Sequence, residues 1–199
     1  INEKTGISVV KKTFTGDQVV PNMGNINVKV NNSTRNSISW GAVYWQYFEE
    51  TDKIVKSSNS GLSVQKKILV EINTPSGPVL KDATNIAKGD KVVIRLVVKA
   101  DRDFEFVHLK DERSSGVEPS ETLSGYKFSD NLFYYQSTLD ASTNFFISYL
   151  PKGTYVFEYS AFANQKGDFS NGSATIQCLY APEFKANTQG SRITIEPLQ

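Results

Sequence analysis

The one histidine of the chain is the first residue to consider for catalysis or metal binding. His108 lies between Val107 and Leu109, and Phe106 comes just before them. A catalytic triad or a histidine-based metal site needs partners that a single histidine does not supply. The apolar neighbours instead predict a strand residue with a polar tip, so we favour a structural role for His108.

The one cysteine is equally isolated. Cys178 lies in the run Thr175-Ile176-Gln177-Cys178-Leu179, and no second cysteine is present to form an internal disulfide. A thiol becomes nucleophilic when a nearby base or positive charge lowers its pKa, and the sequence places no histidine beside this one. We therefore predict a buried thiol at Cys178.

Clustered carboxylates are the next candidates. Asp101, Asp103 and Glu105 alternate with other residues, so a strand would place all three on one face, where a divalent ion could bind. Arg102 lies among them and the glycine of a calcium-binding loop is missing. We favour a solvated sheet edge over a metal site here.

A second acidic group lies in residues 111–125, a stretch poor in apolar residues that we predict to be a long loop. Its members are Asp111, Glu112, Glu118 and Glu121. Two carboxylates about 5–9.5 Å apart can hydrolyse a glycosidic bond, but nothing in a loop sequence fixes such a separation. We keep a loop-based hydrolase as an alternative, and otherwise predict no enzyme activity, no metal site and no cofactor.

Composition excludes other classes of function. The 199 residues carry a net charge of +1, and the pairs Lys11-Lys12 and Lys66-Lys67 are too small to form nucleic-acid patches. No apolar run approaches the roughly 20 residues that span a bilayer. Aromatic residues make up 12% of the chain, which suits the half-buried surfaces of β-strands.

Strand patterns fill most of the chain and predict an antiparallel β-sandwich. The predicted strands are residues 62–64, 68–72, 91–99, 104–109, 131–136, 144–150, 154–163 and 173–179, with additional N-terminal strands at 7–10, 26–30 and 38–48. Turn residues separate them at 75–78, 88–90 and 151–153. Asn171-Gly172-Ser173 fits both a glycosylation acceptor and a hairpin turn, and we favour the turn.

A polar stretch at 56–61 is the best candidate for a linker between domains. It divides the chain into residues 1–57 and residues 61–199. If 1–57 lack their sandwich partners, their apolar strands need cover from elsewhere.

Several motifs in the second part are specific enough to compare with a known family. They include Phe106-Val107-His108-Leu109-Lys110-Asp111-Glu112-Arg113, Ser124-Gly125-Tyr126, Leu150-Pro151-Lys152-Gly153-Thr154-Tyr155 and Tyr180-Ala181-Pro182-Glu183-Phe184. In order and spacing they resemble the C-terminal macroglobulin-like domain of bacterial alpha-2-macroglobulins, over roughly Gly61 to Glu196. The upstream run from Trp40 to Tyr47 is similar to the segment that precedes that domain. The resemblance thus implies that residues 1–57 are the end of a preceding β-sandwich domain and that residues 61–199 are the C-terminal macroglobulin-like β-sandwich domain.

The resemblance implies a macroglobulin-like, immunoglobulin-like sandwich that is the counterpart of the eukaryotic receptor-binding domain. Family members are large periplasmic or extracellular proteins that trap peptidases, and a lipid anchor on the parent protein fits the family. The expected partners are other domains of the parent chain and, through the parent, target peptidases. The expected role of this domain is structural and non-catalytic. Cys178 is followed by Leu179, Tyr180 and Ala181, so it does not match the family's Cys-x-Glu-Gln thioester motif.

Interdomain contacts are the function expected of individual side chains. We predict such contacts for His108, Asp111, Arg113 and Tyr126, because they are polar groups able to pair across an interface at or near a long loop.

The aromatic side chains offer a test of an alternative. We predict that Tyr134, Tyr135, Phe145 and Phe146 pack in the core or between domains. Aromatic side chains exposed in a line on one face would instead favour a carbohydrate- or adhesin-type binding module of a cell-surface protein.

Overall fold

The computed structural model describes residues 11–27, 29, 41–58 and 61–198, in two compact units, Ile1–Gln46 and Tyr47–Gln199. The described part of the first unit holds two short 3-10 helices, η1 (Gly16–Gln18) and η2 (Pro21–Gly24). The predicted strand at 7–10 lies outside the described residues. The predicted strands at 26–30 and 38–48 are not present in their described residues, which are 26, 27, 29 and 41–48. A strand needs a neighbour to accept its main-chain hydrogen bonds, and this unit supplies none to 41–48 in the described part.

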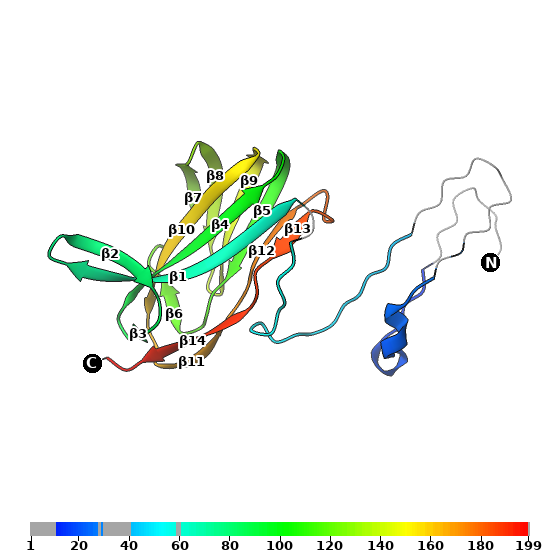
Figure 1. The fold of residues 1–199 in the computed structure, drawn as a ribbon, viewed down its shortest axis with the longest axis horizontal. Helices are drawn as coiled ribbons and strands as arrows, with labels where there is room; N and C mark the ends of the chain where they lie inside the picture. The colour runs from blue at the N-terminus through cyan, green and yellow to red at the C-terminus, as the bar shows by residue number, and fades with distance from the viewer. Residues whose placement is uncertain (1–10, 28, 30–40, 59–60, 199) are drawn as a thin grey trace. The chain divides into compact units, whose positions relative to one another are not determined.

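The second unit is a β-sandwich, which confirms the predicted fold class (Figure 1). One layer is a five-stranded sheet in the order β2 (Gly77–Asp82), β1 (Leu62–Thr74), β4 (Lys91–Ala100), β10 (Gly153–Ala163) and β6 (Val117–Pro119). The other is a six-stranded sheet in the order β13 (Lys185–Asn187), β12 (Ala174–Cys178), β5 (Phe104–Glu112), β9 (Ser142–Leu150), β8 (Leu132–Thr138) and β7 (Gly125–Ser129). All pairings within these two sheets are antiparallel.

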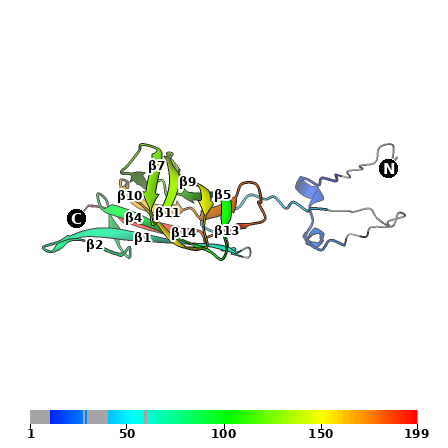
Figure 2. The ribbon, with the colours of Figure 1, turned by 90° about the horizontal axis from the view of Figure 1, so that it is seen from above.

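Figure 2 shows the two layers from the side, with β7, β9 and β5 in one and β1 and β2 in the other. The alternation predicted for β10 is present: Phe157, Tyr159 and Ala161 point into the core, whereas Val156 and Phe162 face outward. The core between the layers is built from such inward positions, including Leu96, Leu109 and Phe145. Burial of these side chains is what holds the sheets together.

A small third sheet closes one end of the sandwich. It contains β11 (Gly167–Asn171), β14 (Ser191–Glu196) and β3 (Ile86–Ala87), and β14 pairs with β3 in parallel. Because β11 and β12 belong to different sheets, residues 171–173 are not the predicted hairpin turn but a crossover between sheets. The predicted turn at 75–78 does join a hairpin, β1–β2, which extends beyond β4 (Figure 1).

Residues 51–57, which we call the strap, run along the edge formed by β13 and β14. The amide of Gly190 donates to the Ile54 carbonyl at 2.9 Å, and Ser57 forms a β-bridge with Asn187. A Cβ at Gly190 would lie 2.0 Å from the Thr51 carbonyl oxygen, so the close approach of the strap requires glycine there. The compact unit thus includes residues ahead of the predicted linker, and the division at 57 and 61 stays a prediction.

Candidate functional site

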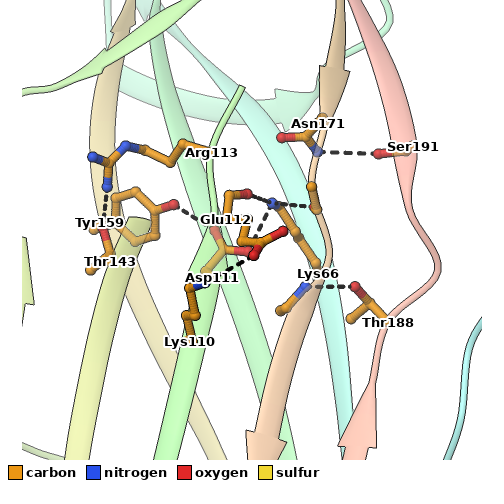
Figure 3. Close-up of polar contacts among 12 residues, drawn as sticks. Lys66, Lys110, Asp111, Glu112, Arg113, Thr143, Tyr159, Asn171, Thr188 and Ser191 are labelled. Atoms are coloured by element: carbon orange, nitrogen blue, oxygen red, sulfur yellow. Dashed lines mark hydrogen bonds and ion pairs between the residues drawn. The ribbon is translucent and has the colours of Figure 1, made fainter. Parts of the chain in front are cut away.

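Two groups of side chains on opposite sides of β5 are the candidates for a functional site, and the first is a buried charge cluster. Lys66 of β1 points into the core, where its Nζ lies 2.8 Å from Oδ1 of Asp111 on β5. It also donates to the main-chain carbonyls of Glu112 and Gly172 (Figure 3). The side chains are 6% and 0% exposed, so this ion pair crosses the interior from one sheet to the other.

Neighbouring polar groups complete the cluster. The Tyr159 hydroxyl of β10 donates to Oδ2 of Asp111 at 2.5 Å. Arg113 donates to the Thr143 hydroxyl at 2.5 Å and to the carbonyls of Leu139 and Asp140, and its guanidinium lies 5.9 Å from the Tyr159 ring centre. The cluster therefore joins β1, β5, β9 and β10.

Burial governs the protonation of this cluster. Desolvation raises the pKa of the Asp111 carboxyl, although Lys66 beside it acts in the opposite direction. Burial, followed by the adjacent Asp111 charge, holds the pKa of the Tyr159 hydroxyl well above its ordinary range. The hydrogen bonds and the ion pair of these groups all go to other parts of the same domain, so the cluster links the sheets, although Arg113 Nε is buried without a hydrogen-bond partner.

The second group is a row of aromatic rings on the outer face of the six-stranded sheet. Direct cross-strand partners share a face, and the register pairs Tyr126 with Tyr135, Tyr135 with Phe146, and Phe146 with His108. We call these four residues the aromatic row. Tyr126 is 71% exposed and Phe146 39%.

Ring contacts fix the geometry of the row. His108 stacks on Phe146 with ring centres 4.7 Å apart and an interplanar angle of 4°. Tyr126 meets Tyr135 edge-on at 5.0 Å and stacks on Phe133 at 5.1 Å. His108 Nε2 lies 3.0 Å from Oδ1 of Asn144, which further restricts the imidazole.

Exposed aromatic residues extend the row. Phe128 and Phe133 form the next outward pair of β7 and β8, and both are exposed. On the other side, Phe106 meets Tyr180 edge-on at 5.1 Å. Phe106 has a φ of 50°, in the left-handed region that residues other than glycine rarely adopt. The β5–β9 pairing is interrupted at this point, since Glu105 pairs with Tyr149 and Val107 with Ile147.

The outer face of the five-stranded sheet has a different composition. Its central row pairs Lys67 with Arg95 and Arg95 with Glu158, and an ion pair joins the last two. Lys91 and Glu71 form another pair at 2.9 Å. Charged side chains keep this face solvated, whereas the aromatic row leaves apolar surface open to solvent.

The four predicted contact residues divide between the two groups. His108 and Tyr126 belong to the aromatic row, whereas Asp111 and Arg113 lie in the buried cluster. Their part in interdomain contacts stays a prediction, which the exposure of Tyr126 favours and the burial of Asp111 and Arg113 does not. The sequence interpretation missed Lys66, although a signal was present: it interrupts the alternating apolar positions of β1 between Val64 and Ile68.

The predicted acidic loop is partly a strand. Asp111 and Glu112 belong to β5 and residues 117–119 form β6, so these carboxylates do not gather in one flexible loop. Of the four carboxylates considered for hydrolysis, Asp111 is held by the Lys66 ammonium and the Tyr159 hydroxyl inside the domain.

The group Asp101, Asp103 and Glu105 does not share a strand face. Only Glu105 lies in β5; Asp101 pairs with Arg102, while Asp103 accepts hydrogen bonds from the Tyr149 hydroxyl at 2.6 Å and the Lys152 amide at 2.8 Å. Within the part of the chain that the structure describes, no group of three metal-ligating side chains is found.

Other predictions can be read directly. Cys178 is buried, as predicted, and burial raises the pKa of its thiol. Of the four aromatic residues predicted to pack, Tyr134 and Phe145 are in the core, whereas Tyr135 is partly buried and Phe146 is exposed, both in the aromatic row. In the described ranges, no helix has the length and apolar character needed to cross a membrane.

Comparison with solved structures agrees with this architecture. A Salmonella alpha-2-macroglobulin reacted with methylamine is 18% identical with a TM-score of 0.57, over 71% of this chain and 10% of that chain. The trypsin-activated Escherichia coli alpha-2-macroglobulin is 15% identical with a TM-score of 0.56, over 72% of this chain and 11% of that chain. These likenesses show the fold, and this chain spans about a tenth of the length of either protein.

An Escherichia coli fragment from domain MG7 to the C-terminus is 16% identical, with a TM-score of 0.57, over 72% of this chain and 24% of that one. No curated protein sequence matches this chain. Residues 61–183, more than half of the chain, match the bacterial alpha-2-macroglobulin MG10 domain. The chain with the aromatic row and the buried charge cluster therefore belongs to the bacterial alpha-2-macroglobulin MG10 domain family.

Proposed function

We propose that this chain is a non-catalytic interaction domain of a bacterial alpha-2-macroglobulin-like peptidase trap. Its partners would be other domains of the same larger chain and, through that chain, target peptidases. The parent protein would then act in the periplasm or outside the cell. The observation that carries the proposal is the aromatic row, which is open to solvent on one outer face while the opposite outer face is charged.

The composition of the row supports a protein partner. Aromatic residues are enriched at protein interfaces, where they contribute large contact areas at low entropic cost. His108 and Tyr126 add polar tips that can pair across such an interface. In the buried charge cluster, the Tyr159 hydroxyl is hydrogen-bonded to the Asp111 carboxylate, and both groups are shielded from solvent. This supports a structural rather than a catalytic role for them.

A pull-down tests this proposal. The 199-residue chain is immobilised and offered the upstream domains of its parent as a separate chain. We expect capture, and we expect Phe146→Ser to weaken it at least tenfold, because that side chain is central to the row. Phe162→Ser is the matched control: Phe162 is 46% exposed, close to the 39% of Phe146, but it lies on the charged outer face. Equal losses for both variants, or no capture, would contradict the proposal.

A carbohydrate-binding module is the second candidate, because exposed aromatic side chains do line up on one face. Sugar rings stack on open aromatic faces. Here His108 and Phe146 cover each other, as do Tyr126 and Phe133, so much of the ring surface is already occupied. Retention of the chain on a glycan array, lost with Tyr126→Ser, together with no capture of the upstream domains, would favour this candidate.

A further inference from the structure

The aromatic row contains one side chain that can change its charge near neutral pH. His108 is the only histidine of the 199 residues, and an imidazole is the side chain that gains a proton between about pH 8 and about pH 5. The other members of the row, Tyr126, Tyr135 and Phe146, are uncharged aromatic residues. A response of this surface to mild acid would therefore come from a single side chain.

Hydrogen bonds show which ring nitrogen of His108 is open to a proton. Nε2 lies 3.0 Å from Oδ1 of Asn144, whose amide nitrogen donates to the Ser142 hydroxyl at 3.2 Å. An amide oxygen only accepts hydrogen bonds, so Nε2 carries a hydrogen and Nδ1 is the nitrogen that binds a proton in acid. The stack on Phe146 is compatible with both states, because a cation against an aromatic ring is also attractive. Protonation should therefore leave the position of the ring unchanged.

The strands on either side of His108 present uncharged side chains to it. Its direct cross-strand partners are Phe146 on β9 and Gln177 on β12. Direct partners share a face of the sheet, so these are the side chains in closest reach of the imidazole. A protonated ring would therefore have no carboxylate as a direct partner on either neighbouring strand.

Charged groups farther from the ring do not supply a counter-ion either. Lys110 is the next outward residue of β5, and its ammonium is paired with Glu112 at 2.9 Å. Lys185 lies on β13, the second strand away from β5. Glu105 is exposed near the start of β5, on the side away from Lys110. In the described part of this face, a protonated imidazole would thus add a positive charge to a surface that already carries two lysines.

We propose that His108 makes the aromatic row a pH-dependent contact, which holds its protein partner near neutral pH and releases it in mild acid. This inference rests on the proposed function, because the partner is the one that covers the row. Apolar side chains of a partner can pack over the neutral imidazole and Phe146 as over two aromatic rings. The same packing over a protonated imidazole would remove a cation from water without a counter-ion, which is costly. Acid should therefore weaken the contact and leave the fold intact.

Binding of the upstream domains at two pH values tests the proposal. We expect the dissociation constant to rise at least about tenfold from about pH 7.5 to about pH 5, because a contact that admits only the neutral ring weakens as the ring is protonated. His108→Phe keeps a ring that can stack on Phe146 and cannot be protonated, so its dissociation constant should change much less between the two pH values. A dissociation constant that does not change with pH in the unmodified chain, or an equal rise in His108→Phe, would overturn the proposal.

Retention of the isolated chain on a phenyl-substituted column separates failure of this inference from failure of the proposed function, because no upstream domain takes part. We expect His108→Phe to be retained longer than the unmodified chain, and the difference to be larger at about pH 5 than at about pH 7.5. Phe146→Ser is the matched control: it removes an uncharged ring of the row, so it should reduce retention at both pH values. A difference between His108→Phe and the unmodified chain that is the same at both pH values would overturn the proposal, whether or not the upstream domains bind.

Discussion

The inner side of β5 carries charged side chains and the outer side carries aromatic ones, which is the reverse of what burial and exposure usually favour. Toward the interior, Asp111 meets the ammonium group of Lys66 from the other sheet. Toward solvent, His108 and Phe146 stack as part of the aromatic row. Charged residues are rarely fully buried unless paired, and a large exposed apolar surface is rare on a domain that acts alone.

This difference suggests that the inner side chains of β5 serve the stability of the fold and that the outer ones serve contacts with other molecules. The buried charges have partners inside the domain, so their loss should destabilise the fold. The exposed rings have open area and few internal bonds, so their loss should leave the fold intact and weaken contacts with other molecules. The following predictions test this division, from the largest expected effect to the smallest.

Asp111→Ala should have the largest effect. It leaves the Lys66 ammonium buried without its carboxylate, and breaking a buried pair in this way costs about 3–5 kcal/mol of unfolding free energy. Denaturant titration would measure the loss. The double variant Lys66→Met/Asp111→Leu should recover most of it, because no uncompensated charge remains. A loss of unfolding free energy below about 1 kcal/mol for Asp111→Ala would mean that the Lys66 ammonium reaches water in the variant. The fold would then not depend on the Lys66–Asp111 ion pair.

The pH dependence of stability should show the burial of Asp111 directly. Its pKa is raised in the folded state, so its contribution to stability is present below the ordinary Asp value of 3.8 and is lost as pH rises through the folded pKa. Each unit of pKa difference corresponds to about 1.4 kcal/mol. The stability advantage of the unmodified chain over Asp111→Asn should therefore shrink as pH rises above the ordinary Asp value of 3.8. An advantage that grows over this range would show that pairing with Lys66 outweighs desolvation.

The stacking of His108 on Phe146 should contribute less. A double-mutant cycle with His108→Ala and Phe146→Ala should give a coupling energy of about 0.5–1 kcal/mol in the unfolding free energy. A coupling near zero would mean that the two rings pack independently. A value comparable to the Asp111→Ala loss would make the outer side a stability element and remove the contrast between the two sides of β5.

Tyr126→Ser should have the smallest effect on the fold. Tyr126 is largely exposed at the end of the aromatic row, and substitutions at such positions change unfolding free energy by about 0.5 kcal/mol or less. The same substitution should reduce capture of the upstream domains. Thermal unfolding of the variant gives the first quantity and the pull-down gives the second; a large loss of stability would contradict the division.

The sequence predicted the sandwich well because its strands alternate. In β10 the inward series Phe157, Tyr159 and Ala161 follows directly from period-two patterning. The turns at 75–78 and 88–90 can also be predicted from the sequence, because each contains a glycine, and Gly77 and Gly89 do adopt positive φ.

The candidate site could be predicted only in part. Lys66 and Asp111 are 45 residues apart in the chain, and the hydropathy pattern ends the predicted strand at Leu109 because Lys110, Asp111 and Glu112 are polar. A pair of opposite charges that meets across two sheets has no local signature. In the same way, alternation shows that Tyr134 and Tyr135 face opposite sides, but only the tertiary packing determines that Tyr134 is the inward one.

The strap gives the domain a defined mechanical anchor. A pull on the chain ahead of residue 51 acts first on the hydrogen bond between the Thr51 and Ser170 hydroxyls at 2.6 Å, next on the Asp52–Arg192 ion pair at 2.9 Å, and then on the Ile54 and Ser57 hydrogen bonds. Force is thereby transferred to β14 and β13, near the C-terminal end of the chain, before it reaches the first strand of the sandwich, β1. The Asp52–Arg192 ion pair is only partly shielded from solvent, so its contribution to this anchor should weaken with acid and with salt.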